Sequence, residues 1–158
     1  MCDDQIRIDD LDIVIDMTQR LVEMGCDHVA LADTKGTTNP TRVRDVMREV
    51  SAAVDMSRLA IHLHDSYGMG IANALTAYEC GVRIFDGSVG GLGGTPFKEH
   101  TKSPGGGGNL ATEELVCMFE RMGISTGVDL DALLKAGRIV TDILKTTGDP
   151  PSMSKLLR

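Results

Sequence analysis

The stretch Ala60-Ile61-His62-Leu63-His64-Asp65-Ser66-Tyr67-Gly68 decides how the rest of the sequence is interpreted. It begins with apolar residues that suit a buried strand, and two histidines and an aspartate follow. Because strand side chains alternate between faces, His62 and His64 are expected to project together while Leu63 packs on the opposite face. Two imidazoles on one face are what a metal ion needs from its first two ligands. The alternative is two unrelated histidines near a strand end.

The composition is that of a globular domain with a core. The chain has 158 residues, of which 42% are hydrophobic, and this fits one soluble domain. Its net charge of -7 argues against nucleic acid or an anionic membrane surface as the main partner. No apolar run approaches the roughly 18 residues that span a bilayer, and the acidic N-terminus is unlike a signal peptide. We therefore expect a protein that binds neither nucleic acid nor membranes.

The four cysteines indicate the redox state and the cellular compartment of the protein. Cys2, Cys26, Cys80 and Cys117 are widely spaced and form no C-x-x-C pair. This spacing excludes a cysteine-rich zinc cluster and a thioredoxin-type motif. Reduced thiols are the simple inference, and they predict a cytoplasmic location.

Strand-like and helix-like segments alternate along the chain. We expect strands over residues 28–34, 59–64 and 82–88, and helices over residues 11–24, 40–54, 71–80, 112–123 and 130–147. Asn39 and Pro40 supply an N-cap and a first helical residue, and Asp129 is expected to cap the last helix. Three such alternations predict parallel strands joined by crossover helices. In folds of this kind the site lies at the carboxyl ends of the strands.

Polar segments lie at the carboxyl ends of the three predicted strands. Asp33 and Thr34 end the first strand, His62, His64 and Asp65 lie at the end of the second, and the glycine-rich residues 90–109 follow the third. A loop of about 20 residues without secondary structure is uncommon and usually functional. Since all three segments lie at carboxyl ends, we expect them to meet at one edge of the sheet and form a single site.

Five segments, taken in order, carry a resemblance to a known family. They are residues 31–36 (LADTKG), 62–68 (HLHDSYG), 72–75 (ANAL), 86–94 (DGSVGGLGG) and 108–116 (GNLATEELV). The segments resemble the second half of 3-hydroxy-3-methylglutaryl-CoA (HMG-CoA) lyase, a member of the DRE-TIM metallolyase superfamily, and the resemblance covers nearly the whole chain. It implies a partial (β/α)8 TIM barrel. Residues 1–158 would be the last three β/α units and the C-terminal helices of one pyruvate carboxyltransferase/HMG-CoA lyase-like domain.

The resemblance also implies a metal site and catalytic residues. His62, His64 and Asn109 match metal ligands, and two imidazoles with an amide oxygen suit Mg²⁺ or Mn²⁺ better than a thiolate-type zinc site would. His62 also matches a residue with a proton-transfer role, and Asp33 matches an active-site acid. Thr95 stands where the family usually places a catalytic cysteine, and a threonine hydroxyl cannot exchange protons comparably.

Three further residues are implied to contact substrate. They are Thr34, Gly93 and Gly94. Glycines allow the backbone to approach a ligand closely.

The reaction implied by the resemblance is retro-Claisen cleavage of HMG-CoA, or of a similar 3-hydroxy-acyl-CoA, to acetyl-CoA and acetoacetate or another 3-oxo acid, a step of leucine catabolism. The alternatives are a related condensing enzyme of the isopropylmalate or citramalate synthase type, a 4-hydroxy-2-oxo acid aldolase, or a non-catalytic fragment.

The expected partners are an acyl-CoA substrate and the missing N-terminal half of the barrel, from the same or another chain. Nothing in the chain matches the family's Arg-Asp-Gly motif of the first strand, and three parallel strands leave both sheet edges open. The full-length protein is expected to be a homo-oligomer.

Overall fold

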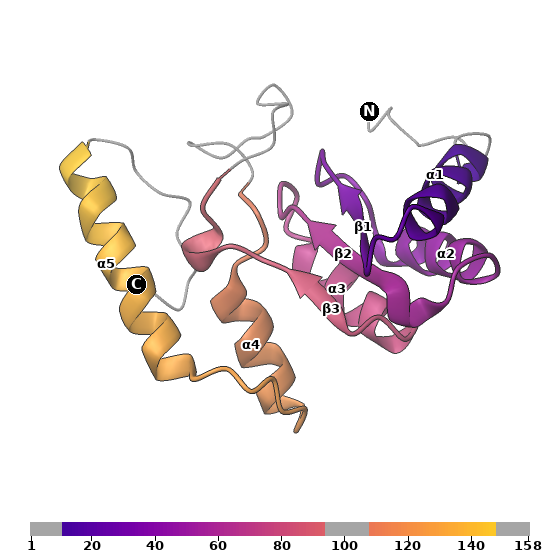
Figure 1. Cartoon of the computed structure of the whole chain (residues 1–158). Coiled ribbons are helices and arrows are strands. Elements are labelled where there is room, and N and C mark those ends of the chain that lie inside the picture. Colours follow the sequence, from indigo (N-terminus) through magenta and orange to yellow (C-terminus); the bar gives the residue numbers. More distant parts are fainter. Residues whose placement is uncertain (1–10, 94–107, 148–158) are drawn as a thin grey trace.

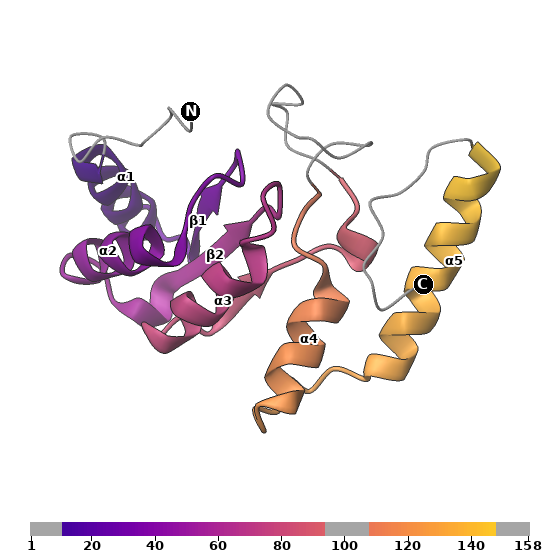
Figure 2. The ribbon, with the colours of Figure 1, turned by 180° about the vertical axis from the view of Figure 1, so that it is seen from behind.

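Helices alternate with three strands along the chain. The computed structural model describes residues 11–93 and 108–147. In chain order its elements are α1 (Leu11–Glu23), β1 (Val29–Asp33), α2 (Pro40–Ser51), the 3-10 helix η2 (Met56–Arg58), β2 (Leu59–Leu63), α3 (Gly70–Glu79), β3 (Ile84–Asp86), the 3-10 helix η3 (Val89–Gly91), α4 (Thr112–Arg121) and α5 (Leu130–Thr147). Figures 1 and 2 show α1 and α5 at opposite ends of the molecule, with the sheet between them.

The strands form one sheet in the order β1-β2-β3, and both pairs are parallel. The register aligns Ala32 of β1 with His62 of β2, and His62 with Asp86 of β3. Parallel neighbours need a long crossover connection, which α2 supplies between β1 and β2 and α3 supplies between β2 and β3. The predicted α/β class with parallel strands and crossover helices is confirmed.

Helices cover one face of the sheet and leave the other open. On the covered face, Ile61 and Leu63 of β2 are only 4% and 2% exposed. Strand side chains alternate, so the intervening residues point the other way. We call this second side the open face; it carries Ala30, Ala32, Ala60, His62, Ile84 and Asp86. All of these except Ala60 and the half-buried His62 are exposed. An uncovered sheet face of this kind fits a partial barrel.

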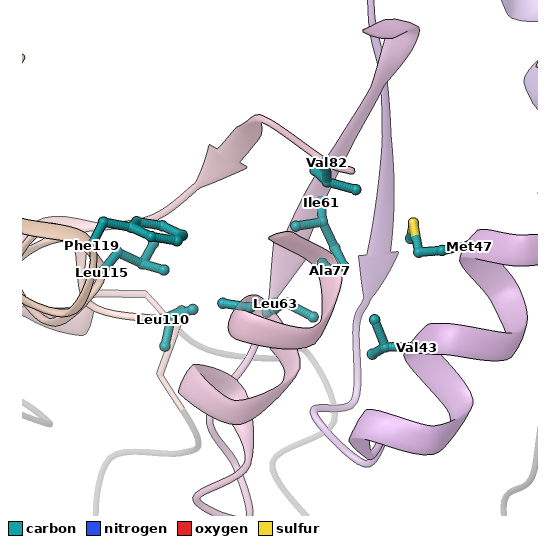
Figure 3. Close-up of a cluster of buried hydrophobic side chains, with 10 residues drawn as sticks. Val43, Met47, Ile61, Leu63, Ala77, Val82, Leu110, Leu115 and Phe119 are labelled. Carbon is teal, nitrogen blue, oxygen red and sulfur yellow. The ribbon is translucent and has the colours of Figure 1, made fainter. Parts of the chain in front are cut away.

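The main hydrophobic core lies between β2 and the helices α2, α3 and α4. Met47, Leu63 and Leu110 are 1%, 2% and 1% exposed at its centre. Figure 3 shows Val43 and Met47 of α2 on one side of the β2 residues Ile61 and Leu63, and Leu115 and Phe119 of α4 on the other. At the α4 end, the ring of Phe119 packs against Phe85 with centroids 5.1 Å apart. This core holds β2 in place between its neighbours.

Capping residues mark the helix ends as predicted. The Asn39 side chain accepts a hydrogen bond from the Arg42 N–H at 3.0 Å and caps α2, with Pro40 as its first residue. The Asp129 carboxylate accepts one from the Ala132 N–H at 3.0 Å and caps α5. Gly25 has a φ of 99° just after α1, where a left-handed residue ends the helix. Within the described ranges, none of these helices has both the length and the apolarity needed to cross a membrane.

Several predicted boundaries were wrong, most of all around the third strand. The third strand spans only Ile84–Asp86 rather than residues 82–88. Val82 lies outside the strand, because its N–H donates back to the Ala77 carbonyl of α3 at 3.0 Å. After β3, Ser88 leaves the sheet because its N–H donates to the Leu110 carbonyl at 3.0 Å. The loop predicted over residues 90–109 to lack secondary structure also begins inside η3.

Burial in this core predicts a large stability difference between two isoleucines. Ile61→Ala is expected to lower the free energy of unfolding by about 2–5 kcal/mol, because it removes a buried side chain and leaves a cavity. The matched control Ile139→Ala removes the same atoms from a side chain that is 62% exposed, so its effect should stay within about 0.5 kcal/mol. Urea unfolding followed by circular dichroism measures both. Equal losses in the two variants would contradict the core described above.

Candidate active site

The end of β2 presents two imidazoles close to each other. The ring centroids of His62 and His64 lie 5.0 Å apart and the rings are nearly perpendicular, at 84°. His62 is half-buried on the open face, and His64 is buried just beyond the strand. The structure thus brings the two histidines together, while Leu63 between them points into the core.

Both imidazoles are held through the same ring atom. Nδ1 of His64 lies 2.9 Å from the carbonyl oxygen of Asp33, and Nδ1 of His62 lies 3.0 Å from Oδ2 of Asp86. A carbonyl oxygen only accepts hydrogen bonds, so Nδ1 of His64 must carry the proton. The same holds for His62 while Asp86 is ionised. Each neutral ring then offers the lone pair of its Nε2, which is the usual state of a metal-binding histidine.

Residues 108–110 run antiparallel along the end of β2 and place Asn109 opposite His64. The Leu110 N–H donates to the Leu63 carbonyl at 3.0 Å, and the Asp65 N–H donates to the Gly108 carbonyl at 3.1 Å. The Asn109 Nδ2 donates to the Leu92 carbonyl at 2.8 Å. Because that carbonyl only accepts, the amide nitrogen must face Leu92 and the amide oxygen is left as an acceptor.

The glycine-rich turn after β3 is fixed by a buried carboxylate. Glu113 is 0% exposed, and its Oε1 and Oε2 lie 2.8 and 3.0 Å from the Gly90 backbone nitrogen, whose N–H they accept. Gly90 has a φ of 68° within η3, a conformation that favours glycine. The turn therefore holds Leu92 where its carbonyl can meet Asn109.

The loop after β1 packs against the histidine segment. The Asp33 carboxylate accepts hydrogen bonds from the N–H groups of Thr37 and Thr38 at 3.2 and 3.0 Å. A Cβ on Gly36 would lie 3.0 Å from the Cβ of His64, so this loop approaches the histidine closely. The three segments that follow the strands do meet at one edge of the sheet.

The structure places most of the predicted site residues at this edge. His62, His64, Asn109 and Asp33 are connected as described above, and Thr34 is exposed directly after β1. Gly93 touches Asn109, because a Cβ on Gly93 would lie 2.8 Å from Asn109 Nδ2. Gly94 and Thr95 lie outside the described residues. The ligand, catalytic and substrate-binding roles of the whole set stay predictions.

Two acidic residues of the site were not predicted. Asp86 faces His62 across the sheet, and the signal for it is the parallel register, which pairs these two residues directly. Glu113 follows Asn109 at the start of α4, where a carboxylate is typical in any helix because of the helix dipole. Its contact with Gly90 could therefore not be predicted from the sequence.

The donor set fits a divalent cation in part. Two imidazole nitrogens and one amide oxygen are available at one edge, and both imidazoles have the outer hydrogen bonds that metal-binding histidines usually make. Among the described residues, however, no group of three His, Cys, Asp or Glu side chains is clustered closely enough to hold a metal. The remaining ligands of a six-coordinate ion would have to be water, substrate or other parts of the protein.

Comparisons with known proteins agree on one family. The family model described as HMGL-like matches residues 1–140. The chain is 44% identical over 131 residues to the mitochondrial hydroxymethylglutaryl-CoA lyase of Bos taurus, an alignment that covers 83% of this chain and 39% of the relative. The chain therefore spans about two fifths of the length of the curated relatives it matches.

Solved structures of the same kind are also similar. The HMG-CoA lyase of Bacillus subtilis superposes with a TM-score of 0.82 at 39% identity, covering 93% of this chain and 46% of that one. An HMG-CoA lyase of Acinetobacter baumannii, in complex with coenzyme A and 3-methylmalate, has a TM-score of 0.77 at 38% identity and covers 90% of this chain and 44% of that one. These likenesses confirm that the fold is part of the predicted TIM barrel.

The contact between Gly93 and Asn109 predicts a position-specific effect of an added methyl group. Gly93→Ala should displace the Asn109 amide from Leu92, because the new Cβ would lie 2.8 Å from Nδ2. The displacement should appear as a shift of the Asn109 side-chain amide signals in a ¹H–¹⁵N spectrum. Gly127→Ala is the matched control, since Gly127 also has a positive φ, of 70°, but nothing within 4 Å of its Cβ position. An unmoved Asn109 signal in Gly93→Ala would show that the contact does not orient the amide.

Proposed function

The chain belongs to the HMGL-like family, and we propose that it forms the C-terminal part of a divalent-metal-dependent carbon–carbon lyase. The substrate we propose is HMG-CoA, with acetyl-CoA and acetoacetate as products. The relatives named HMG-CoA lyase support this reaction, and the coenzyme A bound to the Acinetobacter baumannii relative supports an acyl-CoA substrate. A role in leucine catabolism is part of the same proposal.

One observation carries the proposal. The two imidazoles at the end of β2 lie 5.0 Å apart with both Nδ1 atoms engaged. In their neutral form both rings keep an Nε2 lone pair at the end of β2, and Asn109 pairs with His64 at the same edge of the sheet. Metal-binding histidines almost always make such an outer hydrogen bond, because it fixes the tautomer and the orientation of the ring.

The proposed reaction moves one proton and one electron pair. The tertiary hydroxyl of HMG-CoA loses its proton, the bond between C2 and C3 breaks, and its electron pair stays on C2, which is then protonated to give acetyl-CoA. The carbon that carried the hydroxyl becomes the ketone of acetoacetate. A divalent cation, when bound, would stabilise the negative charge that develops on the substrate oxygens.

The residues of this chain have different roles in the proposed reaction. His64 and Asn109 would hold the cation through Nε2 and Oδ1. Nε2 of His62 is its ring atom without a hydrogen bond in the described part of the chain, so metal binding and proton transfer by His62 both need that atom. The two roles can therefore alternate but cannot coincide. Asp33 orders the loop after β1 through Thr37 and Thr38, and that loop borders the same edge.

Mg²⁺ or Mn²⁺ is the cation that we propose. Divalent-metal dependence fits this family. An amide oxygen and water suit hard cations of this kind, and the imidazoles favour Mn²⁺ over Mg²⁺. We also propose a cytoplasmic location, which is supported by the free thiols of Cys26, Cys80 and Cys117.

We further propose that the remaining strands of the barrel complete this sheet, from the same polypeptide or from another chain, and that the complete protein is a homo-oligomer. Beside β1 lies an apolar groove of about 370 Å³ between α1, β1 and α2. Its lining includes Leu11 and Met17 of α1 and the exposed Ala30 of β1. A further parallel strand beside β1 would cover this groove and pair the outer edge of β1.

The metal site is tested by measuring Mn²⁺ binding directly. His62→Ala and His64→Ala should each weaken Mn²⁺ binding by more than about tenfold, since each removes one ligand. The free Mn²⁺ signal in electron paramagnetic resonance measures the dissociation constant. His28→Ala is the matched control, because His28 is exposed and lies before β1, at the other end of the sheet. Equal binding by all three variants would contradict the proposal.

A further inference from the structure

Asp86 lies in a row of residues that crosses the sheet at His62. The parallel register aligns Ala32 of β1, His62 of β2 and Asp86 of β3 on the open face. Residues that pair directly across parallel strands point to the same side. The alanine on one side of His62 leaves space, and the aspartate on the other side supplies a carboxylate. The sheet itself therefore decides which group meets the ring of His62.

The hydrogen bond between the two side chains is short enough to set the state of the ring. Nδ1 of His62 lies 3.0 Å from Oδ2 of Asp86. An ionised carboxylate only accepts, so this contact favours the tautomer with the proton on Nδ1. His64 is fixed in the same tautomer by a main-chain carbonyl, that of Asp33. Each ring thus has one hydrogen bond to its Nδ1. The partner of His64 is a backbone carbonyl, whereas the partner of His62 is a side chain that substitution can remove.

Resting on the proposed function, we infer that Asp86 is a positioning residue that prepares His62 for a divalent cation. It does so by holding the proton on Nδ1 and fixing the plane of the ring, so that the lone pair of Nε2 is left for the cation. Asp86 itself need not touch the cation or the substrate. Its counterpart for His64 is the carbonyl of Asp33, which no substitution removes.

The exposure of the pair favours orientation over stability as its role. The side chains of His62 and Asp86 are 26% and 62% exposed. Ion pairs and hydrogen bonds at such exposure add little to folding stability. Loss of the Asp86 carboxylate should therefore leave the protein folded, and this makes the inference testable by substitution.

The first test reads the tautomer of His62 without any metal. Long-range ¹H–¹⁵N correlation spectra of the full chain distinguish a ring protonated at Nδ1 from one protonated at Nε2. We expect His62 to be protonated at Nδ1 in the wild type and to shift toward the Nε2-protonated form in Asp86→Ala. Asp86→Asn should keep the wild-type pattern, because its Oδ1 can still accept the hydrogen bond. His64 is the internal reference, and its pattern should not change in any variant.

The second test measures Mn²⁺ affinity by electron paramagnetic resonance. Asp86→Ala should weaken binding by about 10- to 100-fold, the usual cost of removing an outer-shell partner, and Asp86→Asn should weaken it less. Asp27→Ala is the matched control, since Asp27 is an exposed aspartate before β1 and the change removes the same charge.

The two tests separate this inference from the proposed function. If His62 keeps the proton on Nδ1 in Asp86→Ala, the positioning role is wrong, whatever happens to the metal. If the tautomer shifts as expected but the wild type binds no Mn²⁺, Asp86 still positions His62 while the metal proposal fails. If Asp86→Ala and Asp27→Ala weaken Mn²⁺ binding equally, the effect is one of net charge, and the inference is overturned.

Discussion

The burial of Leu63 determines which way the histidines of β2 face. Leu63 is 2% exposed in the core between β2 and the helices. Its neighbours in the strand must therefore point away from that core, because adjacent strand residues alternate. A shift of register by one residue would bury both imidazoles among apolar side chains and expose the leucine. The burial of apolar side chains on one face of β2 thus determines that the imidazoles point away from the core.

Main-chain atoms do much of the positioning at the site. The carbonyls of Asp33 and Leu92 orient His64 and Asn109, and the Gly90 N–H is held by the buried carboxylate of Glu113. The segments that follow β1, β2 and β3 are consequently joined to one another by hydrogen bonds at the edge of the sheet. Movement of one loop would disturb the orientation of a side chain carried by another. This is a reason for the glycines at positions 36 and 93, where close packing against other segments leaves no space for a Cβ.

The sequence was sufficient to predict the parts of the fold that depend on local pattern. The alternation of apolar runs with amphipathic helices predicted the parallel sheet, and Asn39 and Asp129 predicted two helix starts. The pairing of His62 with His64 followed from strand periodicity alone. What could not be predicted depends on contacts between distant segments. β3 is shorter than expected because Ser88 pairs with Leu110, and Asp86 meets His62 only through the register of β3 with β2.

The outer edge of β1 has a consequence for how the chain behaves in solution. Within the described residues β1 pairs only with β2, so one row of its backbone amides and carbonyls faces outward beside an apolar groove. Such an edge is a template on which any extended segment can add, including a segment from an identical molecule. An edge left unpaired in this way would therefore favour self-association of the chain at high concentration.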